Sequence, residues 1–233
     1  MVIIVQEHNA SRYTDLMDQM FRLRARVFAQ RLGWDVEVSN GRERDKYDCL
    51  GPVYLIHTGI DGKQVRASLR VLPTTGPTLL SGFFSDTVPA GLDLRSPHIW
   101  ECTRVCIDDD LHVGERDKIH SLILLLEALG DMAVDAGIHS FVGNFDSSTL
   151  QLYRRLGCDV DVIGSTERYG APVYLGYFPV RKSTISRLRA RREQLCESPR
   201  LSVTRSSNHE RDDAGFEDAI EAPGKGLDER AQV

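Results

Sequence analysis

The order of apolar segments in this chain predicts an α/β fold in which a mixed central sheet is flanked by helices. Two observations carry the prediction. Residues 115–136 place apolar side chains at helical spacing over a broad stripe, as expected of a helix that covers a sheet. Strand patterns at residues 99–107 and 139–145 lie on either side of it, and a second helix pattern follows at residues 147–156. Because a strand-helix-strand unit pairs its strands in parallel, one parallel pair is expected in the middle of the sheet.

The first third of the chain contributes a strand, a helical segment and a loop. Residues 1–7 are predicted to form the first strand, and residues 11–31 one or two helices opened by an Asn/Ser capping signal. Residues 33–50 form a polar loop with a turn signal at Asn40-Gly41. This loop carries several charged side chains of both signs.

The next two strands are predicted to form a hairpin. Residues 53–58 and 65–72 are apolar runs separated by Asp61-Gly62, a strong turn signal. Alternation along the second run places four apolar side chains on one face, namely Val65, Ala67, Leu69 and Val71. Arg70 then points away from that face.

The strand at residues 99–107 presents a conflict between pattern and chemistry. In a regular strand Glu101 and Arg104 lie on opposite faces, because successive side chains alternate. If both serve one site, the strand needs a β-bulge or must splay from its neighbour. We therefore predict an irregularity between Trp100 and Ile107.

The C-terminal part combines two more strands with a charged extension. Strands are predicted around residues 158–163 and at 173–180, and Gly157 is expected to end the helix before them. The chain is therefore divided into a domain of residues 1–182 and an extension of residues 183–233. Residues 181–205 hold eight basic and two acidic side chains, and residues 206–233 eight acidic and three basic ones. A helix is expected at residues 186–196 and disorder beyond Pro199, in an extension that is solvated, folds back on itself or binds an acidic partner.

Composition restricts the class of protein. The 233 residues are 41% hydrophobic and 27% charged, which fits one globular domain with an appendage. No apolar run approaches the length of about 18 residues needed to span a membrane, and the N-terminus lacks a basic signal-peptide region. A cytoplasmic protein is therefore expected. The five cysteines contain no C-x-x-C pair, which favours reduced thiols over disulfides or a zinc site, and no metal is expected.

Nine residues, spread over four blocks of the sequence, match the residue pattern of one enzyme family. The first block lies in residues 21–48, the second is SLRVLPT at 68–74, the third PTLLSGFF at 77–84 and the fourth WECTR at 100–104. The matching residues are Arg24, Phe28, Trp34, Asp45, Asp48, Arg70, Phe84, Glu101 and Arg104. Over about residues 1–180 the chain resembles the acyl-homoserine-lactone synthases, the LuxI-type autoinducer synthases of quorum sensing. The resemblance implies a fold similar to that of GCN5-related N-acetyltransferases.

The resemblance also implies a reaction. Family members acylate the amino group of S-adenosylmethionine from a thioester, usually an acyl carrier protein and sometimes acyl-CoA, and then close the lactone with release of methylthioadenosine. Both molecules are substrates, so no cofactor is expected. The alternative is a general GCN5-like N-acyltransferase that uses acyl-CoA. It is disfavoured by DLHVGERD at residues 110–117, where one glycine and three acids suit an anionic diphosphate poorly. A non-catalytic relative is a third reading.

The roles that the resemblance implies divide between proton transfer and binding. Glu101 is the candidate base, acting through a water, with Arg70 or Arg104 tuning its charge. The candidates for binding S-adenosylmethionine are Arg24 and Arg104 for its carboxylate, Phe28 and Trp34 for its ring or cation, and Asp45 and Asp48 for its ammonium group or for holding arginines. In the competing interpretation, the charged residues form a buried ion-pair cluster that only fixes the loop.

The acyl chain is expected between the strand at 139–145 and the helix after it. The predicted lining residues are Phe84, Trp100, Phe141, Val142, Gly143, Phe145, Leu150, Leu152 and Tyr153. In the family a threonine on this strand tends to accompany 3-oxo-acyl substrates, whereas Gly143, Asn144 and Phe145 stand here. We therefore expect a 3-unsubstituted or otherwise atypical acyl chain, unless Asn144 points inward and replaces the hydroxyl.

A carrier protein is acidic, so a basic patch is expected to receive it. The candidates are Arg154, Arg155, Arg181 and Lys182. Arginines in the last turn of a helix also complement its dipole without any partner. Nucleic acid is not expected as a partner, because the chain has no nucleic-acid-binding motif and a pI of about 5.8.

Overall fold

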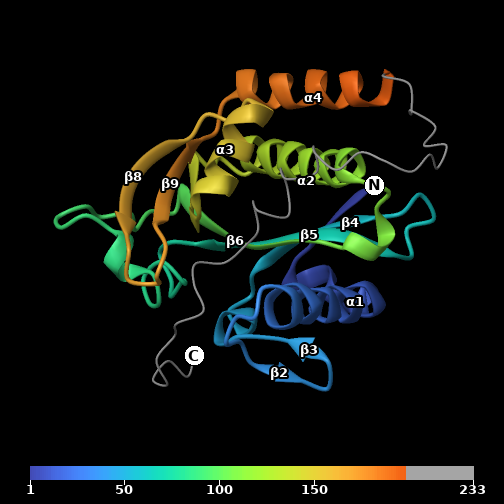
Figure 1. Cartoon of the computed structure of the whole chain (residues 1–233), viewed down its shortest axis with the longest axis horizontal. Helices are drawn as coiled ribbons and strands as arrows, with labels where there is room; N and C mark the ends of the chain where they lie inside the picture. Colours follow the sequence, from blue (N-terminus) through green and yellow to red (C-terminus); the bar gives the residue numbers. More distant parts are fainter. Residues whose placement is uncertain (198–233) are drawn as a thin grey trace, which may run out of the picture.

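The computed structural model describes residues 1–197, which are built around a seven-stranded mixed sheet (Figure 1). The strand order is β1-β4-β5-β6-β7-β9-β8. The strands are β1 (Val2–Val5), β4 (Val53–Thr58), β5 (Val65–Pro73), β6 (Ile99–Ile107), β7 (Ser140–Phe145), β8 (Asp161–Thr166) and β9 (Val173–Pro179). Neighbouring strands are antiparallel, apart from the parallel pair β6 and β7. The predicted α/β class with one central parallel pair is confirmed.

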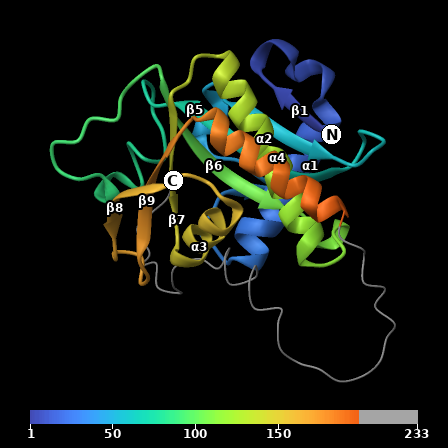
Figure 2. The same cartoon turned by 90° about the horizontal axis from the view of Figure 1, so that it is seen from above.

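Helices cover both faces of the sheet. Helix α1 (Thr14–Arg24) lies on one face, and α2 (Glu115–Asp135) and α3 (Ser147–Leu156) lie on the other (Figure 1). Helix α4 (Lys182–Glu197) runs along α2 (Figure 2). A small hairpin of β2 (Val38–Ser39) and β3 (Arg42–Glu43) lies beside α1. The remaining short elements are a π-helical segment at Ala25–Arg31 and 3₁₀ turns at Glu7–Arg12, Lys46–Cys49, Ser85–Thr87 and Asp109–Leu111.

Each face of the sheet has its own apolar core. The core under α2 takes side chains such as Leu55, Leu69 and Leu125, and the core under α1 takes Phe21, Phe28 and Ile56. This division follows from alternation along β4 and β5, which sends neighbouring residues to opposite faces. The sheet is therefore buried on both sides through its centre.

The central strands β6 and β7 stay paired over a short distance only. Their pairing covers three positions, from Ile99 with Ser140 to Glu101 with Val142. On its other edge β6 is irregular against β5, because Arg70 pairs with Thr103 but Ser68 pairs with Cys106. Two residues of β6, one of them Arg104 at φ 53°, therefore lie opposite one residue of β5. The predicted irregularity between Trp100 and Ile107 is confirmed.

Three details of the sequence-based assignment were wrong, namely the face of Val65 and the starts of β8 and α4. Val65 packs in the α1 core instead of with Ala67, because Arg66 is an extra residue in the register with β4 and reverses the alternation. Strand β8 begins at Asp161 instead of near residue 158.

Helix α4 begins at Lys182, four residues earlier than predicted, because Ile185 and Leu188 are buried within the fold. The boundary proposed after residue 182 therefore falls in its first turn. The disorder expected beyond Pro199 lies outside the described residues. Among the helices of residues 1–197, none combines the length and the hydropathy that a membrane span requires.

Candidate active site

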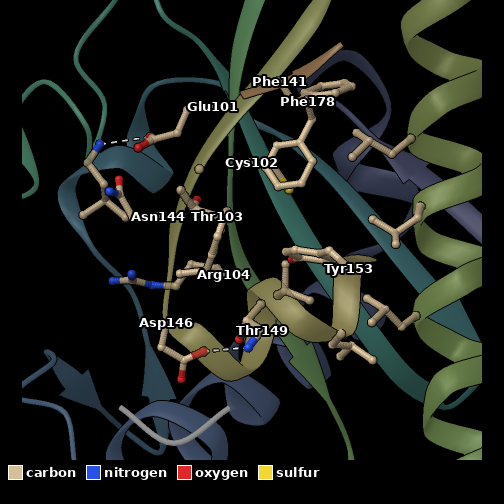
Figure 3. Close-up of a pocket in the computed structure, with 18 of the residues that line it drawn as sticks. Glu101, Cys102, Thr103, Arg104, Phe141, Asn144, Asp146, Thr149, Tyr153 and Phe178 are labelled. Atoms are coloured by element: carbon tan, nitrogen blue, oxygen red, sulfur yellow. Dashed lines mark hydrogen bonds between the residues drawn. The ribbon is translucent and has the colours of Figure 1, made fainter. Parts of the chain in front are cut away.

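A cavity of about 350 Å³ lies where β6 and β7 part. Its polar end is lined by Glu43, Asp45, Glu101 and Arg104. Its other end is lined by apolar side chains from β7, β9, α2, α3 and α4. Figure 3 shows Glu101 and Arg104 on one side of this space and Phe141, Tyr153 and Phe178 on the other. A polar group can therefore react at one end while an apolar chain lies in the other.

Six charged side chains form an ion-pair cluster at and behind the polar end. Its members are Arg24, Arg70, Arg104, Glu43, Asp45 and Asp48. Three cations meet three carboxylates, so the cluster is neutral as a whole. At least 90% of each of these side chains is buried, and a buried charge is tolerated only when it is paired and hydrogen-bonded in this way.

Within the cluster each arginine has a fixed set of acceptors. The Arg24 guanidinium donates to Glu43 at 2.5 Å and to both Asp48 oxygens at 2.8 and 2.9 Å. The Arg70 guanidinium donates to Asp45 at 2.6 and 2.9 Å and to Asp48 at 2.8 Å. Arg104 donates to Glu43 at 3.1 Å and lies 3.0 Å from Asp45.

The loop that supplies the carboxylates is held by its own backbone. The Asp45 side chain accepts from the Tyr47 N–H at 3.0 Å, and Asp48 accepts from the Asp45 N–H at 2.9 Å. This reciprocal capping of one helical turn fixes both carboxylates. Tyr54 donates its hydroxyl to Asp48 at 2.7 Å. Burial acts to raise the pKa of Asp48, but Arg24 and Arg70 outweigh it and hold that pKa well below its usual range.

Glu101 is buried at the junction of β6 and β7. Its two oxygens accept from the Leu79 N–H at 3.0 Å and the Leu80 N–H at 2.6 Å. Burial raises the pKa of Glu101 to about 7, although these N–H groups and the charges of Arg70 and Arg104 act to lower it. A carboxyl group with this pKa exchanges a proton near neutral pH, as a general base must.

Two groups of aromatic rings line the cavity. Phe28 and Trp34 stack with centroids 4.9 Å apart, and the Arg104 guanidinium carbon lies 5.1 Å from the Phe28 centroid. The stack forms because the chain turns back at Gly33, at φ 64°, so that the Trp34 N–H donates to the Phe28 carbonyl at 2.8 Å. The second group is Phe83, Phe84 and Tyr169, with Phe83 and Tyr169 stacked at 5.2 Å.

The apolar end differs in part from the predicted acyl pocket. Six predicted residues line it: Phe84, Phe141, Gly143, Phe145, Leu152 and Tyr153. Three do not: Trp100, Val142 and Leu150. Val142 points to the opposite face of β7, where it packs with Leu80 and Leu175. Trp100 lies before the strands part and donates its indole N–H to Pro97, and Leu150 is buried in α3 away from the cavity.

Asn144 lines the cavity with a defined polarity. Its amide nitrogen donates to the Thr87 hydroxyl at 2.9 Å, and that hydroxyl donates to the Phe84 carbonyl at 2.7 Å. Because the Thr87 proton is used on Phe84, Thr87 can only accept from Asn144. The Asn144 carbonyl oxygen is left buried without a partner among the described residues. Thr87 therefore holds the Asn144 side chain in one orientation through one of its two amide N–H groups.

The family model for autoinducer synthases matches residues 7–188. The chain belongs to this family. An acyl-homoserine-lactone synthase of Rhizobium etli is 38% identical over 77% of this chain and 84% of the relative. The synthase of Agrobacterium fabrum is 31% identical over 88% of this chain and 94% of the relative.

Solved structures of synthases have the same fold. LasI aligns with a TM-score of 0.70 at 28% identity, covering 82% of this chain and 94% of LasI. BjaI, a CoA-dependent synthase solved with SAM and isopentyl-CoA, aligns with a TM-score of 0.75 at 26% identity, covering 83% of this chain and 89% of BjaI. A protein from Lactobacillus plantarum described as an N-acetyltransferase aligns with a TM-score of 0.50 at 17% identity, covering 77% of this chain and 99% of that protein. This likeness indicates a shared fold only. The family and fold predicted from the sequence are confirmed.

The structure places the residues predicted for substrate binding, catalysis and docking in three locations. Phe28, Trp34, Asp45, Glu101 and Arg104 line the cavity. Arg24, Asp48 and Arg70 do not line it and support it from behind through the ion-pair cluster. The four candidate docking residues Arg154, Arg155, Arg181 and Lys182 are exposed, but Arg181 pairs with Asp159 at 3.2 Å.

Several residues that line the cavity were not predicted from the sequence. Glu43 is fully buried and joins Arg24 to Arg104, although it lies in a loop of mixed charges and looked like a solvated side chain. Its place two residues before Asp45, in the arginine-rich loop, was the available signal. Phe83, Tyr169 and the residues of α2 and α4 come from segments distant in the sequence, and local patterns carried no sign that these meet.

Proposed function

We propose that this chain is an acyl-homoserine-lactone synthase that acylates the amino group of S-adenosylmethionine from an acyl thioester. The amine attacks the thioester carbon and the thiol leaves. The carboxylate then attacks the methionine Cγ, which closes the lactone and releases methylthioadenosine. The observation that carries the proposal is a buried carboxyl group with a pKa of about 7, placed where a polar pocket opens into an apolar cavity.

In this proposal Glu101 takes the proton from the substrate's ammonium group. Glu101 is a buried carboxyl group that lines the cavity and accepts from two backbone N–H groups, whereas Glu43 and Asp45 at the same end are both ion-paired with arginines. The two N–H groups of the segment at 79–80 keep it oriented toward the cavity. A water between Glu101 and the amine would carry the proton, as expected from the sequence.

Arg104 is the proposed ligand of the substrate carboxylate. Of the three arginines in the cluster it alone lines the cavity, and 10% of its side chain is exposed against 1% for Arg24 and 0% for Arg70. A guanidinium fork suits the two oxygens of a carboxylate. Arg24 is therefore reassigned from the carboxylate to support of Glu43 and Asp48. The stacked Phe28 and Trp34 face the same space and suit the sulfonium or the adenine ring.

The acyl donor is proposed to be an acyl carrier protein or acyl-CoA. The acidic segment at 110–117, which disfavoured CoA, is partly neutralised in the folded chain, because Arg66 lies 3.7 Å from Asp117. The two acids just before this segment are paired as well. Arg26 pairs with Asp108, and Lys118 pairs with Asp109 at 2.8 Å. Both donors therefore stay open, with Arg154 and Arg155 as the proposed contact for an acidic carrier. A cytoplasmic location, where both substrates are made, is part of the proposal.

Mass spectrometry of the lipophilic extract of cells that express the chain tests the proposed reaction. An acyl-homoserine lactone is expected, and the Glu101→Gln variant should not produce it. A chain that forms no lactone with any donor, purified and supplied with S-adenosylmethionine, would contradict the proposal.

A further inference from the structure

Helix α4 supplies part of the cavity wall, although it follows the last strand of the sheet. Thr184, Ile185 and Leu188 of α4 line the apolar end, opposite Leu129 and Gly130 of α2. Ile185 and Leu188 are 6% and 3% exposed. The segment expected from the sequence to be an appendage therefore closes a substrate cavity.

The contact between α2 and α4 depends on a glycine inside a helix. A Cβ atom at Gly130 would lie 2.7 Å from Ile185 Cγ1 and 3.0 Å from Cδ1, which is closer than real contacts allow. Glycine is unfavourable in a helix interior, and here it leaves the space that Ile185 occupies. Ile185 is therefore backed by the main chain of α2 and has no room to move in that direction.

A second set of contacts holds the first turns of α4 over the end of the cavity. Asp159, in the link between α3 and β8, accepts from the Thr184 hydroxyl at 2.7 Å and from Arg187 at 2.7 Å. It also accepts from Arg181 at 3.2 Å, and Arg187 donates to the Gly157 carbonyl at 3.0 Å. These bonds tie α4 to the end of α3.

We propose that α4 sets the maximum length of the acyl chain, with Ile185 and Leu188 as the stop against which its methyl end rests. This inference rests on the proposed function, since it assigns the apolar end to the acyl group of the donor. A longer chain would have to displace Ile185, which is blocked by Gly130, or pull α4 from Asp159. Chains that end short of Ile185 would leave apolar surface unfilled and bind less tightly.

Two substitutions at one position test the stop in opposite directions. Purified Ile185→Ala and Ile185→Phe variants are supplied with S-adenosylmethionine and an equimolar series of saturated acyl thioesters, and the lactones are quantified by mass spectrometry. Ile185→Ala should move the distribution to longer chains, and Ile185→Phe to shorter ones, because Gly130 forces the added volume into the cavity. The ratio of products that differ by two methylenes should change by about tenfold or more.

A matched control separates the stop from a loosened helix. Leu195 packs α4 against the same core but does not line the cavity, so Leu195→Ala should weaken the helix contact and leave the distribution unchanged. The proposal is overturned if Ile185→Ala and Ile185→Phe give the parent distribution, or if Leu195→Ala shifts it as Ile185→Ala does.

A binding measurement keeps this inference separate from the proposed reaction. Linear fatty alcohols of increasing length should raise the Tm of the parent up to a limiting length, and that limit should move up in Ile185→Ala and down in Ile185→Phe. If the parent makes no lactone, the reaction is wrong while this shift still supports the stop. If the limiting alcohol length is the same in the parent and in both variants, the proposal that α4 sets the maximum acyl length is wrong, even if lactone is made.

Discussion

Six paired charges lie at and behind the polar end of the cavity, whereas aliphatic and aromatic side chains of β7, β9, α2, α3 and α4 form its other end. The polar end depends on pairs with fixed geometry, in which losing one partner leaves another charge buried. The apolar end depends on volume, where a change of one methyl group has a graded effect. Substitutions at the polar end should therefore abolish function or folding, and substitutions at the apolar end should change which substrate is used.

The largest effect is expected when the base is removed. Glu101→Gln keeps the size of the side chain but cannot take a proton, and kcat should fall by about 10²- to 10⁴-fold. Glu127→Gln is the matched control, because Glu127 is also a buried carboxylate of the fold but pairs with Arg192 away from the polar end. Release of methylthioadenosine measures both. A kcat within a few-fold of the parent in Glu101→Gln would remove Glu101 from the chemistry.

Breaking the ion-pair cluster is expected to have the next largest effect, on stability. Asp48→Ala leaves Arg24 and Arg70 without one shared partner and should lower the free energy of unfolding by about 3–5 kcal/mol. Urea titration measures the change. Asp18→Ala removes a solvent-accessible carboxylate from Arg22 and Arg42 and should lower the free energy of unfolding far less, because solvent screens these pairs. Equal losses in the two variants would mean that the cluster is not held as described.

Much of the polar end was predictable because it lies in compact blocks of sequence. Phe28 and Trp34 are six residues apart, Asp45 and Asp48 share one turn, and the conflict between Glu101 and Arg104 on one strand predicted the bulge that the structure contains. Glu43 was not predicted, because a carboxylate among arginines looks the same whether it is solvated or buried. Its burial is decided by α1, β3 and β6 together.

The apolar end was less predictable, because its wall comes from five separate elements. The predicted β7 residues Phe141, Gly143 and Phe145 line the cavity, whereas Trp100, Val142 and Leu150 do not, because the point at which β6 and β7 part could not be placed from the sequence. The few apolar residues of α4 lie in a segment, residues 181–205, that holds eight basic and two acidic side chains, and that composition favoured a solvated extension. Packing on Gly130 decides its position, and no local pattern records this contact.

The pH dependence of stability sharpens the description of Glu101. The folded state raises its pKa to about 7 from an ordinary value near 4.5, so the folded protein binds the proton more tightly than the unfolded chain. This stabilisation is complete below about pH 4.5 and is lost as pH rises to about 7. The free energy of unfolding of the parent, relative to Glu101→Gln, should fall by about 3 kcal/mol between pH 4 and pH 8. A difference independent of pH would mean that Glu101 ionises as in water.

A smaller effect is expected outside the cavity. Reversing both charges at Arg154 and Arg155 should raise the KM for acyl carrier protein by about tenfold, in line with the loss of steered association, and leave the KM for S-adenosylmethionine unchanged. The exposed Arg191 of α4 provides the control substitution, Arg191→Glu. Equal changes in both KM values would reject the docking surface.

The smallest effect concerns the substituent at the 3-position. One of the two N–H groups of the Asn144 amide already donates to Thr87, and neither Gly143 nor Phe145 beside it carries a hydroxyl. A 3-oxo-acyl thioester should therefore be used no better than the unsubstituted thioester. Competition between equal amounts of the two thioesters measures the preference. A dominant 3-oxo lactone would show that Asn144 turns its donor to the substrate.

One competition assay tests the division between the two ends most directly. The parent, Arg104→Lys and Ile185→Phe are given limiting S-adenosylmethionine and equimolar acyl thioesters of increasing length. Arg104→Lys keeps the charge but loses the fork, so total lactone should fall while the distribution of chain lengths stays that of the parent. Ile185→Phe should shorten the distribution without changing the KM for S-adenosylmethionine. A changed distribution in Arg104→Lys, together with a raised KM for S-adenosylmethionine in Ile185→Phe, would show that the two ends do not act separately.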